Sequence, residues 1–575
     1  MDHNENADGD ETRWEAKQEE LLHADFEQGA DADNVSRFGL DAHPVVFPVS
    51  LAMIGLFLAG TILLGETAAT FYDSVNAFIN ANFGWLYILA ANAFIVALLG
   101  IAASKYGEIR IGGLGATPAY STFEWMAMLF SAGMGIGLMF WSVAEPMAHL
   151  GTGGGTMFPF EPNTGAAAQA ALGITYFHWG IHPWAIYGLV ALGLSFFAFN
   201  RGLPLTFRSM FYPLFGERVF GWPGHVIDLV TVFATIFGLA TSLGLGAAQI
   251  NAGLSIVLDR TVGLGLPSAT GIQLAIIAVI TAITGLSVWA GIDRGLKRLS
   301  TLNVYLMVLL MLFVLAVGPT RYLLEAILRE VGFYVQNLPR MAFFTETFLG
   351  ELANGKAAGW QDTWTIFYWG WWIAWSPFVG LFIARISRGR SIRQMVLGVL
   401  LLPTGFSMTW LGSFGGLAVY TQLELGGRIQ QTVAREGAAY AMFELLGSYP
   451  LSTITSTVAV AVVVTFFVTS ADSGSQVIAL VTAGGKLDVP QRQRMLWAVT
   501  VGVVAAALLL GGGLDALQTA AITTGLPFAV VILVLIYTLF RGLAHEHAVL
   551  EEIETPSSLS EERRPDALRS DASDD

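Results

Sequence analysis

Aromatic side chains gather in two apolar stretches of this sequence. The stretch 363–386 holds four tryptophans within seven residues, and Trp372 and Trp375 lie about one helical turn apart near its middle. The stretch 166–198 adds Trp179, Trp184 and Tyr187. Tryptophan in membrane proteins usually marks the headgroup layer, but these rings are expected nearer mid-membrane depth. They predict an aromatic cage, which binds a quaternary ammonium group through the ring quadrupoles.

Few acidic residues accompany these rings. Glu145 and Asp472 are the only carboxylates clearly inside apolar stretches. A cage without an acid suits a zwitterion that carries its own carboxylate. Asp472 remains a functional candidate because a carboxylate is costly in lipid, unless it lies at the inner interface.

A glycine-rich run could receive that carboxylate. The run Ser131–Pro146 reads SAGMGIGLMFWSVAEP. It contains three glycines within five residues, at Gly133, Gly135 and Gly137. Glycine weakens a helix by about 1 kcal/mol per residue relative to alanine, and unwound backbone at bilayer depth occurs where it lines a cavity. The alternative is a GxxxG face for helix packing.

Adjacent hydroxyl groups could bind a cation. Thr469 and Ser470 lie deep in the apolar stretch 452–477. With carbonyls freed from an unwound partner they could ligate Na⁺, and the alternative is that they bond back to their own helix. A proton relay would instead use His178 and His182, although such histidines more often join neighbouring helices.

These residues require a membrane scaffold. Of the 575 residues, 54% are hydrophobic and 13% charged, whereas a soluble domain is about 25% charged. Cysteine is absent from the sequence, and no nucleophile–base pair, metal cluster or broad basic face suggests an enzyme or a nucleic-acid binder. Twelve apolar runs are long enough to span a bilayer. They lie near 46–66, 84–104, 122–145, 166–198, 226–257, 269–290, 301–318, 363–386, 393–420, 452–477, 494–512 and 518–540.

The flanking charges predict the orientation. Loops on the side of the termini carry 16 Lys and Arg residues against 7 on the other side, which favours two cytoplasmic tails. The acidic tails 1–43 and 542–575 are predicted to be disordered, and 44–541 form one membrane domain. Residues 320–350 are predicted to contain an amphipathic helix on the outer surface.

Breaks in two runs suggest internal symmetry. Glycines interrupt the third run, and Gly370 and Pro377 are expected to interrupt the eighth, five runs later. Breaks in corresponding positions of two halves are typical of transporters built from inverted repeats. Pro183 is also expected to kink the fourth run.

Five long motifs resemble the betaine/carnitine/choline transporter family. They are GMGIGLMFWSVAEP, HWGIHPWAIY, FGLATSLGLGAAQINAGL, WTIFYWGWWIAWSPFVGLFIARISRGRSIR and FFVTSADSGS. The resemblance covers about residues 45–540 and is especially close to Na⁺-coupled glycine betaine transporters. It implies an all-α membrane protein of twelve helices with a LeuT-like fold of two inverted five-helix repeats, spans 3–7 and 8–12.

The resemblance also assigns site residues. The aromatic box and its pathway correspond to Trp179, Trp184, Tyr187, Trp371, Trp372 and Trp375, and the unwound substrate segment to Gly133, Met134, Gly135 and Gly137. One Na⁺ site corresponds to carbonyls of Ser131, Met134 and Phe466 and to hydroxyls of Thr469 and Ser470. A second corresponds to Thr235 and Phe378, but Leu239 stands where the family has a threonine. That site is weaker, uses an oxygen such as that of Thr241, or is absent.

The function implied by the resemblance is Na⁺ symport of glycine betaine or a related trimethylammonium or dimethylsulfonium zwitterion. It implies alternating access in the cell membrane, contact with membrane lipid, Na⁺ as the coupling ion without a covalent cofactor, and a homotrimer formed through 320–350. A choline importer driven by H⁺ or Na⁺ and an ion-independent carnitine-type antiporter are the alternatives. The short acidic C-terminal tail does not support sensing through attraction to anionic lipid.

Overall fold

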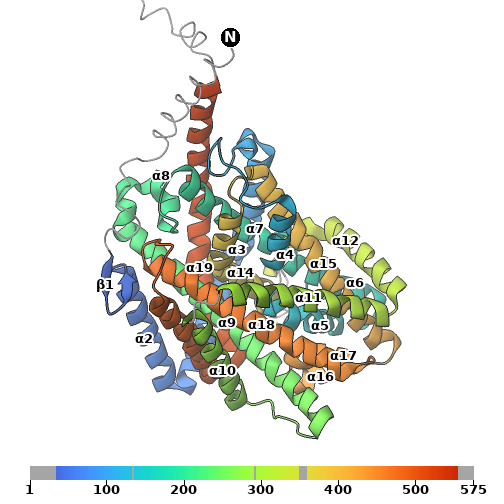
Figure 1. The fold of residues 1–575 in the computed structure, drawn as a ribbon. Coiled ribbons are helices and arrows are strands. Elements are labelled where there is room, and N and C mark those ends of the chain that lie inside the picture. Colours follow the sequence, from blue (N-terminus) through green and yellow to red (C-terminus); the bar gives the residue numbers. More distant parts are fainter. Residues whose placement is uncertain (1–33, 133–134, 290–292, 349–358, 555–575) are drawn as a thin grey trace, which may run out of the picture.

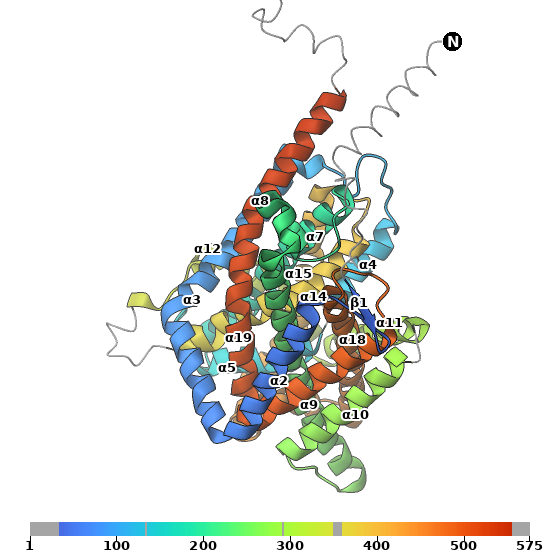
Figure 2. The ribbon, with the colours of Figure 1, turned by 90° about the vertical axis from the view of Figure 1, so that its left-hand side faces the viewer.

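The computed structural model describes residues 34–132, 135–289, 293–348 and 359–554. It is built almost entirely of helices packed side by side, and the last turns of α19 project beyond the bundle (Figures 1 and 2). The helices are α2 Val46–Leu64, α3 Glu66–Ala103, α4 Thr122–Ala132, α5 Ile136–Gly151, α6 Gly165–Trp179, α7 Ile181–Ser195, α8 Tyr212–Phe215, α9 Trp222–Val262, α10 Thr270–Trp289, α11 Asp293–Val317, α12 Thr320–Ala342, α14 Phe367–Ile386, α15 Ile392–Glu424, α16 Ile429–Glu436, α17 Ala441–Gly447, α18 Ser452–Thr482 and α19 Gln491–Glu554. Strands β1 Val35–Arg37 and β2 Leu40–Ala42 form an antiparallel hairpin.

Ten helical segments among the described residues are long and apolar enough to cross a membrane. Two features of the structure explain why it has ten such segments where twelve apolar runs were predicted. The run 122–145 is divided between α4 and α5, which are both short. The runs 494–512 and 518–540 lie within α19, whose two parts meet at a kink where Gly512 and Gly513 have non-helical backbone angles.

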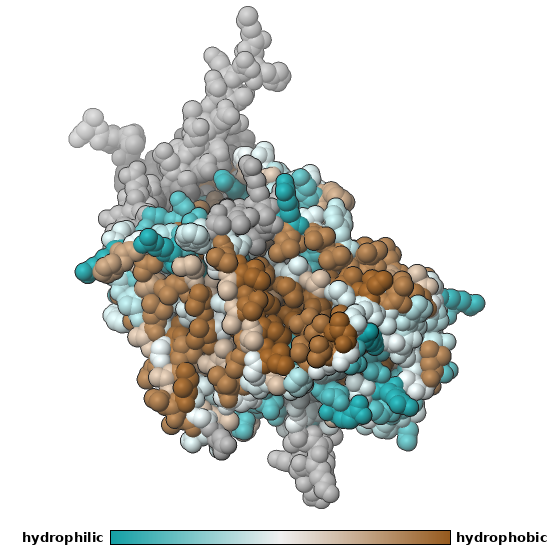
Figure 3. Space-filling model, turned by 60° about the horizontal axis from the view of Figure 1, so that its bottom comes forward, coloured by the Kyte–Doolittle hydropathy of each residue, from teal (hydrophilic) through white to brown (hydrophobic). Residues whose placement is uncertain are grey.

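Burial separates inner helices from outer ones. The most apolar window is 89% buried in the segment of α6 and α7, 83% in that of α14 and 78% in α9. In α2, α10 and α11 it is only 28%, 28% and 22% buried. The outer helices therefore present apolar side chains to the surroundings, and Figure 3 shows such side chains gathered over a broad area of one face. A surface of this kind suits lipid, and the inner helices carry the candidate site.

The predicted disorder of 1–43 and 542–575 is wrong for the parts that the structure describes. Residues 34–43 form the hairpin, which binds the end of α18: His43 N donates to the Thr482 carbonyl at 2.9 Å, and Lys486 pairs with Asp41 at 2.6 Å. Helix α19 continues through the predicted tail as far as Glu554. The remaining tail residues, 1–33 and 555–575, lie outside the described residues.

His43 is expected to make the docking of this hairpin sensitive to pH. Its Nδ1 accepts the backbone N–H groups of Val45 and Val46, both at 3.2 Å, at the start of α2. Burial, then the charge of Arg208 and neighbouring His225, lower the pKa of His43 from 6.5 to about 3. Because the folded-state pKa lies below the unfolded one, the stability supported by the neutral ring is complete above pH 6.5 and is lost as the pH falls toward 3.

We therefore expect the melting temperature of the purified protein to fall between about pH 7 and pH 5. In His43→Asn the fall should be smaller, because asparagine also accepts hydrogen bonds at a helix start but does not titrate. Thermal unfolding of both proteins across this range measures the difference. Equal pH slopes would contradict the role of His43.

The expected breaks in the fourth and eighth runs lie elsewhere. Helix α14 is continuous through Gly370 and Pro377. Gly370 instead allows α19 to approach, since a Cβ there would lie 3.0 Å from the Cα of Ile522. The break between α6 and α7 falls at Gly180, not at Pro183, which occupies the first turn of α7 where proline is tolerated. The paired breaks that suggested inverted repeats are thus not both present.

Candidate functional site

The glycine-rich run contains a helix break. Helix α4 ends at Ala132 and α5 begins at Ile136, and Gly135 between them is fully extended with φ −166° and ψ 178°. Gly133 and Met134 lie outside the described residues, as does the side chain of Ser131. The geometry at Gly135 favours unwound backbone over a continuous GxxxG helix, and it places the N-terminus of α5 at the break.

A small cavity adjoins this break. Its volume is about 30 Å³, which suits about two water molecules. All six aromatic residues predicted for the cage contribute to its wall. The lining residues are Gly135, Gly137, Leu138, Trp179, Pro183, Trp184, Tyr187, Ser242, Trp371, Trp372, Trp375 and Ser407. Helices α5, α6, α7 and α14 therefore bring to one place the rings that the sequence distributes over two stretches.

The rings of the cage pack against one another. Trp371 and Trp372 stack with centroids 4.6 Å apart and an interplanar angle of 15°, and the edge of Trp179 meets Trp372 at 4.8 Å. Trp184 and Tyr187 meet edge to face at 5.4 Å. Two indole N–H groups are anchored, with Trp372 donating to the His178 carbonyl at 3.0 Å and Trp371 to the Ser242 hydroxyl at 3.2 Å. The packed rings leave a cavity of about 30 Å³ between them.

Gly137 permits this packing. A Cβ at that position would lie 2.7 Å from the ring of Trp179 and 2.8 Å from the ring of Trp371. At Gly135 the nearest atom to such a Cβ is in Trp375, at an ordinary contact distance of 3.7 Å. Gly135 and Gly137 thus have different roles. Of these two positions, only Gly137, in the first turn of α5, requires the absence of a side chain.

The expectation of a cage without an acidic neighbour is wrong. Glu145, on α5, is fully buried and accepts three hydrogen bonds. The donors are Trp179 Nε1 at 2.9 Å, the Tyr368 hydroxyl at 2.5 Å and His178 Nδ1 at 2.6 Å. Glu145 is therefore bonded directly to a cage residue. The sequence offered only its intramembrane position as a signal, because its three partners lie on α6 and α14.

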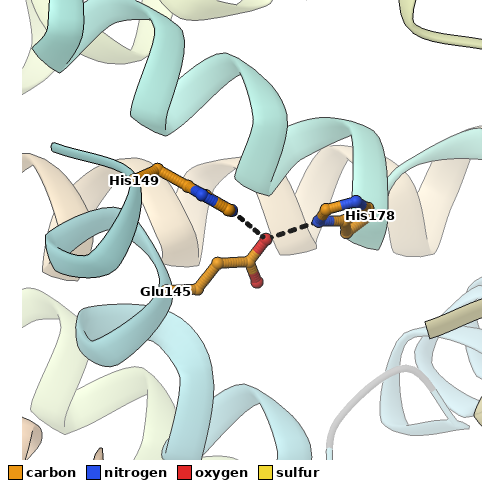
Figure 4. Close-up of side chains that lie close together, drawn as sticks. All are labelled: Glu145, His149 and His178. Atoms are coloured by element: carbon orange, nitrogen blue, oxygen red, sulfur yellow. Dashed lines mark hydrogen bonds and ion pairs between the residues drawn. The ribbon is translucent and has the colours of Figure 1, made fainter. Parts of the chain in front are cut away.

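Glu145, His149 and His178 form a compact cluster (Figure 4). Their nearest donor atoms all lie within 4.8 Å of one another, a spacing that a metal ion could bridge. Hydrogen bonds already use both carboxylate oxygens and both His178 nitrogens, since His178 Nε2 lies 3.0 Å from the Thr365 hydroxyl. His149 Nε2 lies 3.5 Å from Glu145 Oε1. We interpret the cluster as a hydrogen-bond network that holds the cage.

His178 and His182 do not form the relay considered from the sequence. The break at Gly180 separates them. His182 Nε2 instead lies 3.4 Å from Asn92 Oδ1, and its ring stacks on Trp369. The two histidines therefore belong to different contacts.

Of the side chains predicted for the first Na⁺ site, the structure describes those on α18. Thr469 donates to the carbonyls of Thr465 at 2.9 Å and Phe466 at 3.2 Å. Ser470 is buried beside it. Asp472 pairs with Arg494 at 3.5 Å. This ion pair explains the presence of a carboxylate in the apolar stretch without a role in the cage.

The residues predicted for the second Na⁺ site are surrounded by apolar side chains and by hydroxyl groups that already make hydrogen bonds. Thr235 donates to the Thr231 carbonyl at 2.7 Å. Leu239 fills the space beside Gly474, where a Cβ would lie 2.2 Å from the leucine. Thr241 donates to the carbonyls of Phe237 and Leu517 at 2.9 and 2.8 Å, so it joins α9 to α19. Phe378 packs on Trp375 with centroids 5.4 Å apart.

A comparison with models of protein families establishes which class of protein this is. The model of the betaine/carnitine/choline family of transporters matches residues 45–548. The chain belongs to the betaine/carnitine/choline transporter family. It is therefore a multi-pass membrane transporter and not an enzyme, and the resemblance found in the motifs is confirmed.

Similar members of the family have named substrates. A glycine betaine/proline/choline transporter of Vibrio parahaemolyticus is 44% identical over 540 residues, which cover 91% of this chain and 95% of the relative. A glycine betaine transporter of the same species is 45% identical over 519 residues, covering 89% and 96%. An ectoine/glycine betaine/proline transporter of Corynebacterium glutamicum is 37% identical over 529 residues, covering 91% and 84%.

Proposed function

We propose that this betaine/carnitine/choline transporter imports glycine betaine, or a closely related quaternary ammonium or sulfonium zwitterion, by Na⁺ symport with alternating access. The observation that carries the proposal is the cavity at the α4–α5 break, which six aromatic rings line. Rings of this kind attract a trimethylammonium group through their faces. Glycine betaine also appears in the names of all three relatives above.

The zwitterion has a partner for each of its charges. Its ammonium group would separate the rings of Trp179 and Trp372 and take the place of their mutual contact. Its carboxylate would face the N-terminus of α5, whose free amides and dipole favour an anion. The Nε1–H of Trp375 has no hydrogen-bond acceptor among the residues that the structure describes, so it is a further donor for that carboxylate.

Na⁺ would bind between α18 and the helix break. Thr469 and Ser470 supply hydroxyl oxygens, and carbonyls of Ser131, Met134 and Phe466 complete the proposed site. The hydrogen bonds that Thr469 donates leave its oxygen lone pairs free to bind a cation. An ion there would hold α18 against the same backbone that receives the substrate. Ion and substrate would then favour the same state, which is the requirement for coupling.

Thr469→Ala is expected to raise the Na⁺ concentration for half-maximal uptake by about tenfold, the factor that corresponds to about 1.4 kcal/mol of lost ion affinity. Thr457→Ala is the matched control, because Thr457 lies on the same helix, is exposed, and bonds back to its own backbone in the same way. Uptake by proteoliposomes over a series of Na⁺ concentrations measures both variants. An unchanged Na⁺ dependence in Thr469→Ala would argue against this ion site.

The finer architecture is part of the proposal. The chain would cross the cell membrane twelve times in a LeuT-like arrangement, with both termini in the cytoplasm. Helix α12 would join three copies, because Leu324, Leu328 and Val335 are 50%, 74% and 63% exposed on it. Leu239 removes one expected ligand of the second Na⁺ site at Thr235 and Phe378. The number of ions per substrate therefore needs a direct measurement, for example from reversal potentials.

Uptake by proteoliposomes tests the function. Labelled glycine betaine, choline, carnitine, ectoine and proline are offered with and without an inward Na⁺ gradient. We expect glycine betaine to accumulate only with the gradient. Preferential choline uptake driven by H⁺ or Na⁺ would instead support the choline importer, and gradient-independent exchange of carnitine would support the antiporter.

A further inference from the structure

Glu145 lies immediately behind the cage and organises it. Its Oε2 accepts hydrogen bonds from Trp179 and Tyr368. The ring of Tyr368 in turn stacks on Trp372 at 5.7 Å and meets Trp179 edge to face at 5.6 Å. His178, bonded to Oε1, also accepts the indole N–H of Trp372 through its carbonyl. One carboxylate is therefore connected to both tryptophans that would enclose the ammonium group.

The hydrogen bonds indicate that this carboxylate is charged. An indole N–H can only donate, and here Trp179 and Tyr368 both address the same oxygen. His178 Nδ1 lies 2.6 Å from the other oxygen, so three groups that can donate surround the carboxylate, as is typical of an ionised one.

The neighbouring histidine does not cancel this charge. His178 Nε2 is the hydrogen-bond partner of the Thr365 hydroxyl, which has no other acceptor within the described ranges of the chain. A hydroxyl that donates to Nε2 fixes the neutral tautomer of His178, with its proton on Nδ1. His149, the other histidine of the cluster, packs against Trp364 with ring centroids 4.5 Å apart. With a neutral ring at His149 as well, the cluster would carry one net negative charge.

We propose that Glu145 is a positioning residue that makes the cage selective for a cation. Its carboxylate aims Trp179 through the indole N–H and draws electron density toward the ring face, and its own charge acts in a poorly solvated interior where screening is weak. The inference rests on the proposed substrate class and adds a specificity determinant to the aromatic rings. A cage without this charge would bind trimethylammonium and tert-butyl groups more equally.

Glu145→Gln isolates the charge from the shape. The Gln carbonyl can accept from Trp179 and Tyr368, and its NH₂ can donate to His178 Nδ1 once that ring takes the other tautomer and donates from Nε2 to Thr365. The variant therefore keeps the size of the side chain and a hydrogen-bond partner for Trp179, Tyr368 and His178 Nδ1. Glu330→Gln is the matched control, because Glu330 is a buried carboxylate on α12 that does not line the cavity.

The test compares two ligands of the same shape. Glycine betaine and tert-butylacetate (the carboxylate 3,3-dimethylbutanoate) differ only in the charged nitrogen that replaces a carbon. Tryptophan fluorescence gives the dissociation constant of each ligand for the purified full-length protein. In Glu145→Gln we expect glycine betaine to bind about tenfold more weakly, the size that a unit charge one ring away has at an effective dielectric constant of about 20. Binding of tert-butylacetate should stay within about twofold or become tighter, and Glu330→Gln should change neither.

Equal weakening of both ligands would assign Glu145 a merely structural role and overturn the proposal, as would no weakening of either. Failure of the unaltered protein to bind glycine betaine would instead reject the proposed function. If Glu145→Gln does not fold, infrared difference spectra of the unaltered protein replace it, with betaine isotope-labelled at its own carboxylate. We expect betaine to shift an ionised protein carboxylate band, and an unchanged carboxylate region would overturn the proposal.

Discussion

Trp372→Leu is expected to abolish uptake of glycine betaine while the protein still reaches the membrane. Trp372 is the central ring of the cage, since it stacks on Trp371 at 4.6 Å and meets Trp179 at 4.8 Å and Tyr187 at 6.4 Å. Leucine has no quadrupole and cannot donate to the His178 carbonyl. A desolvated cation–π contact is worth about 2 kcal/mol, so the loss of this ring alone corresponds to about a 30-fold loss in affinity.

The measurement is initial uptake of labelled betaine by cells in which the amount of membrane-inserted protein is quantified. Trp497→Leu is the matched control, because Trp497 is equally buried but packs near the hairpin, where its indole donates to the Thr482 hydroxyl. The control should transport at a rate that follows its expression level. Normal uptake by Trp372→Leu would rule out the cage.

Gly137→Ala is expected to reduce uptake by about ten- to a hundredfold, although it adds only one methyl group. The new Cβ would lie under 3.0 Å from the rings of both Trp179 and Trp371. These rings are held by Glu145 and by the Ser242 hydroxyl, so they cannot turn away freely. Overpacking of this kind costs about 1–3 kcal/mol, and here the displaced atoms are the proposed binding surface.

Gly135→Ala is the control from the same run. Its backbone is extended at φ −166°, a conformation open to any residue, and the nearest atom to its Cβ is 3.7 Å away. We expect it to retain at least about half of the uptake, because the added methyl group would meet the Trp375 ring at an ordinary contact distance. Equal loss in both variants would mean that the run needs glycine for flexibility and not for its closeness to the rings.

The cage residues could be predicted because the information was local. Trp372 and Trp375 share a helix face through their spacing, and the position of a residue within an apolar run estimates its depth in the membrane. Trp179, Trp184 and Tyr187 were predicted from their place in a second apolar stretch, and the family resemblance added Trp371. Glu145 was recognised as an intramembrane carboxylate but not as a neighbour of the cage, because its contact with Trp179 depends on how α5 packs against α6.

Two wrong expectations have different causes. Gly370 was read as a break in a helix, but its role is to admit Ile522 of α19, which is distant in sequence. The disorder expected for residues 34–43 came from the average composition of the whole tail. A local signal was present, since Phe38 and Gly39 form the turn of the hairpin with φ of 57° and 76°, and glycine favours such a turn.

The close packing of the cage rings also has a consequence for the leak of ions through the protein. With the rings in contact at 4.6 and 4.8 Å, the cavity that they line is only about 30 Å³. In the proposed transport cycle, rings packed in this way would close the pathway through the protein at the substrate site itself. Glycine betaine would separate these rings, so the residues proposed to recognise the solute would also limit the leak of ions between transport cycles.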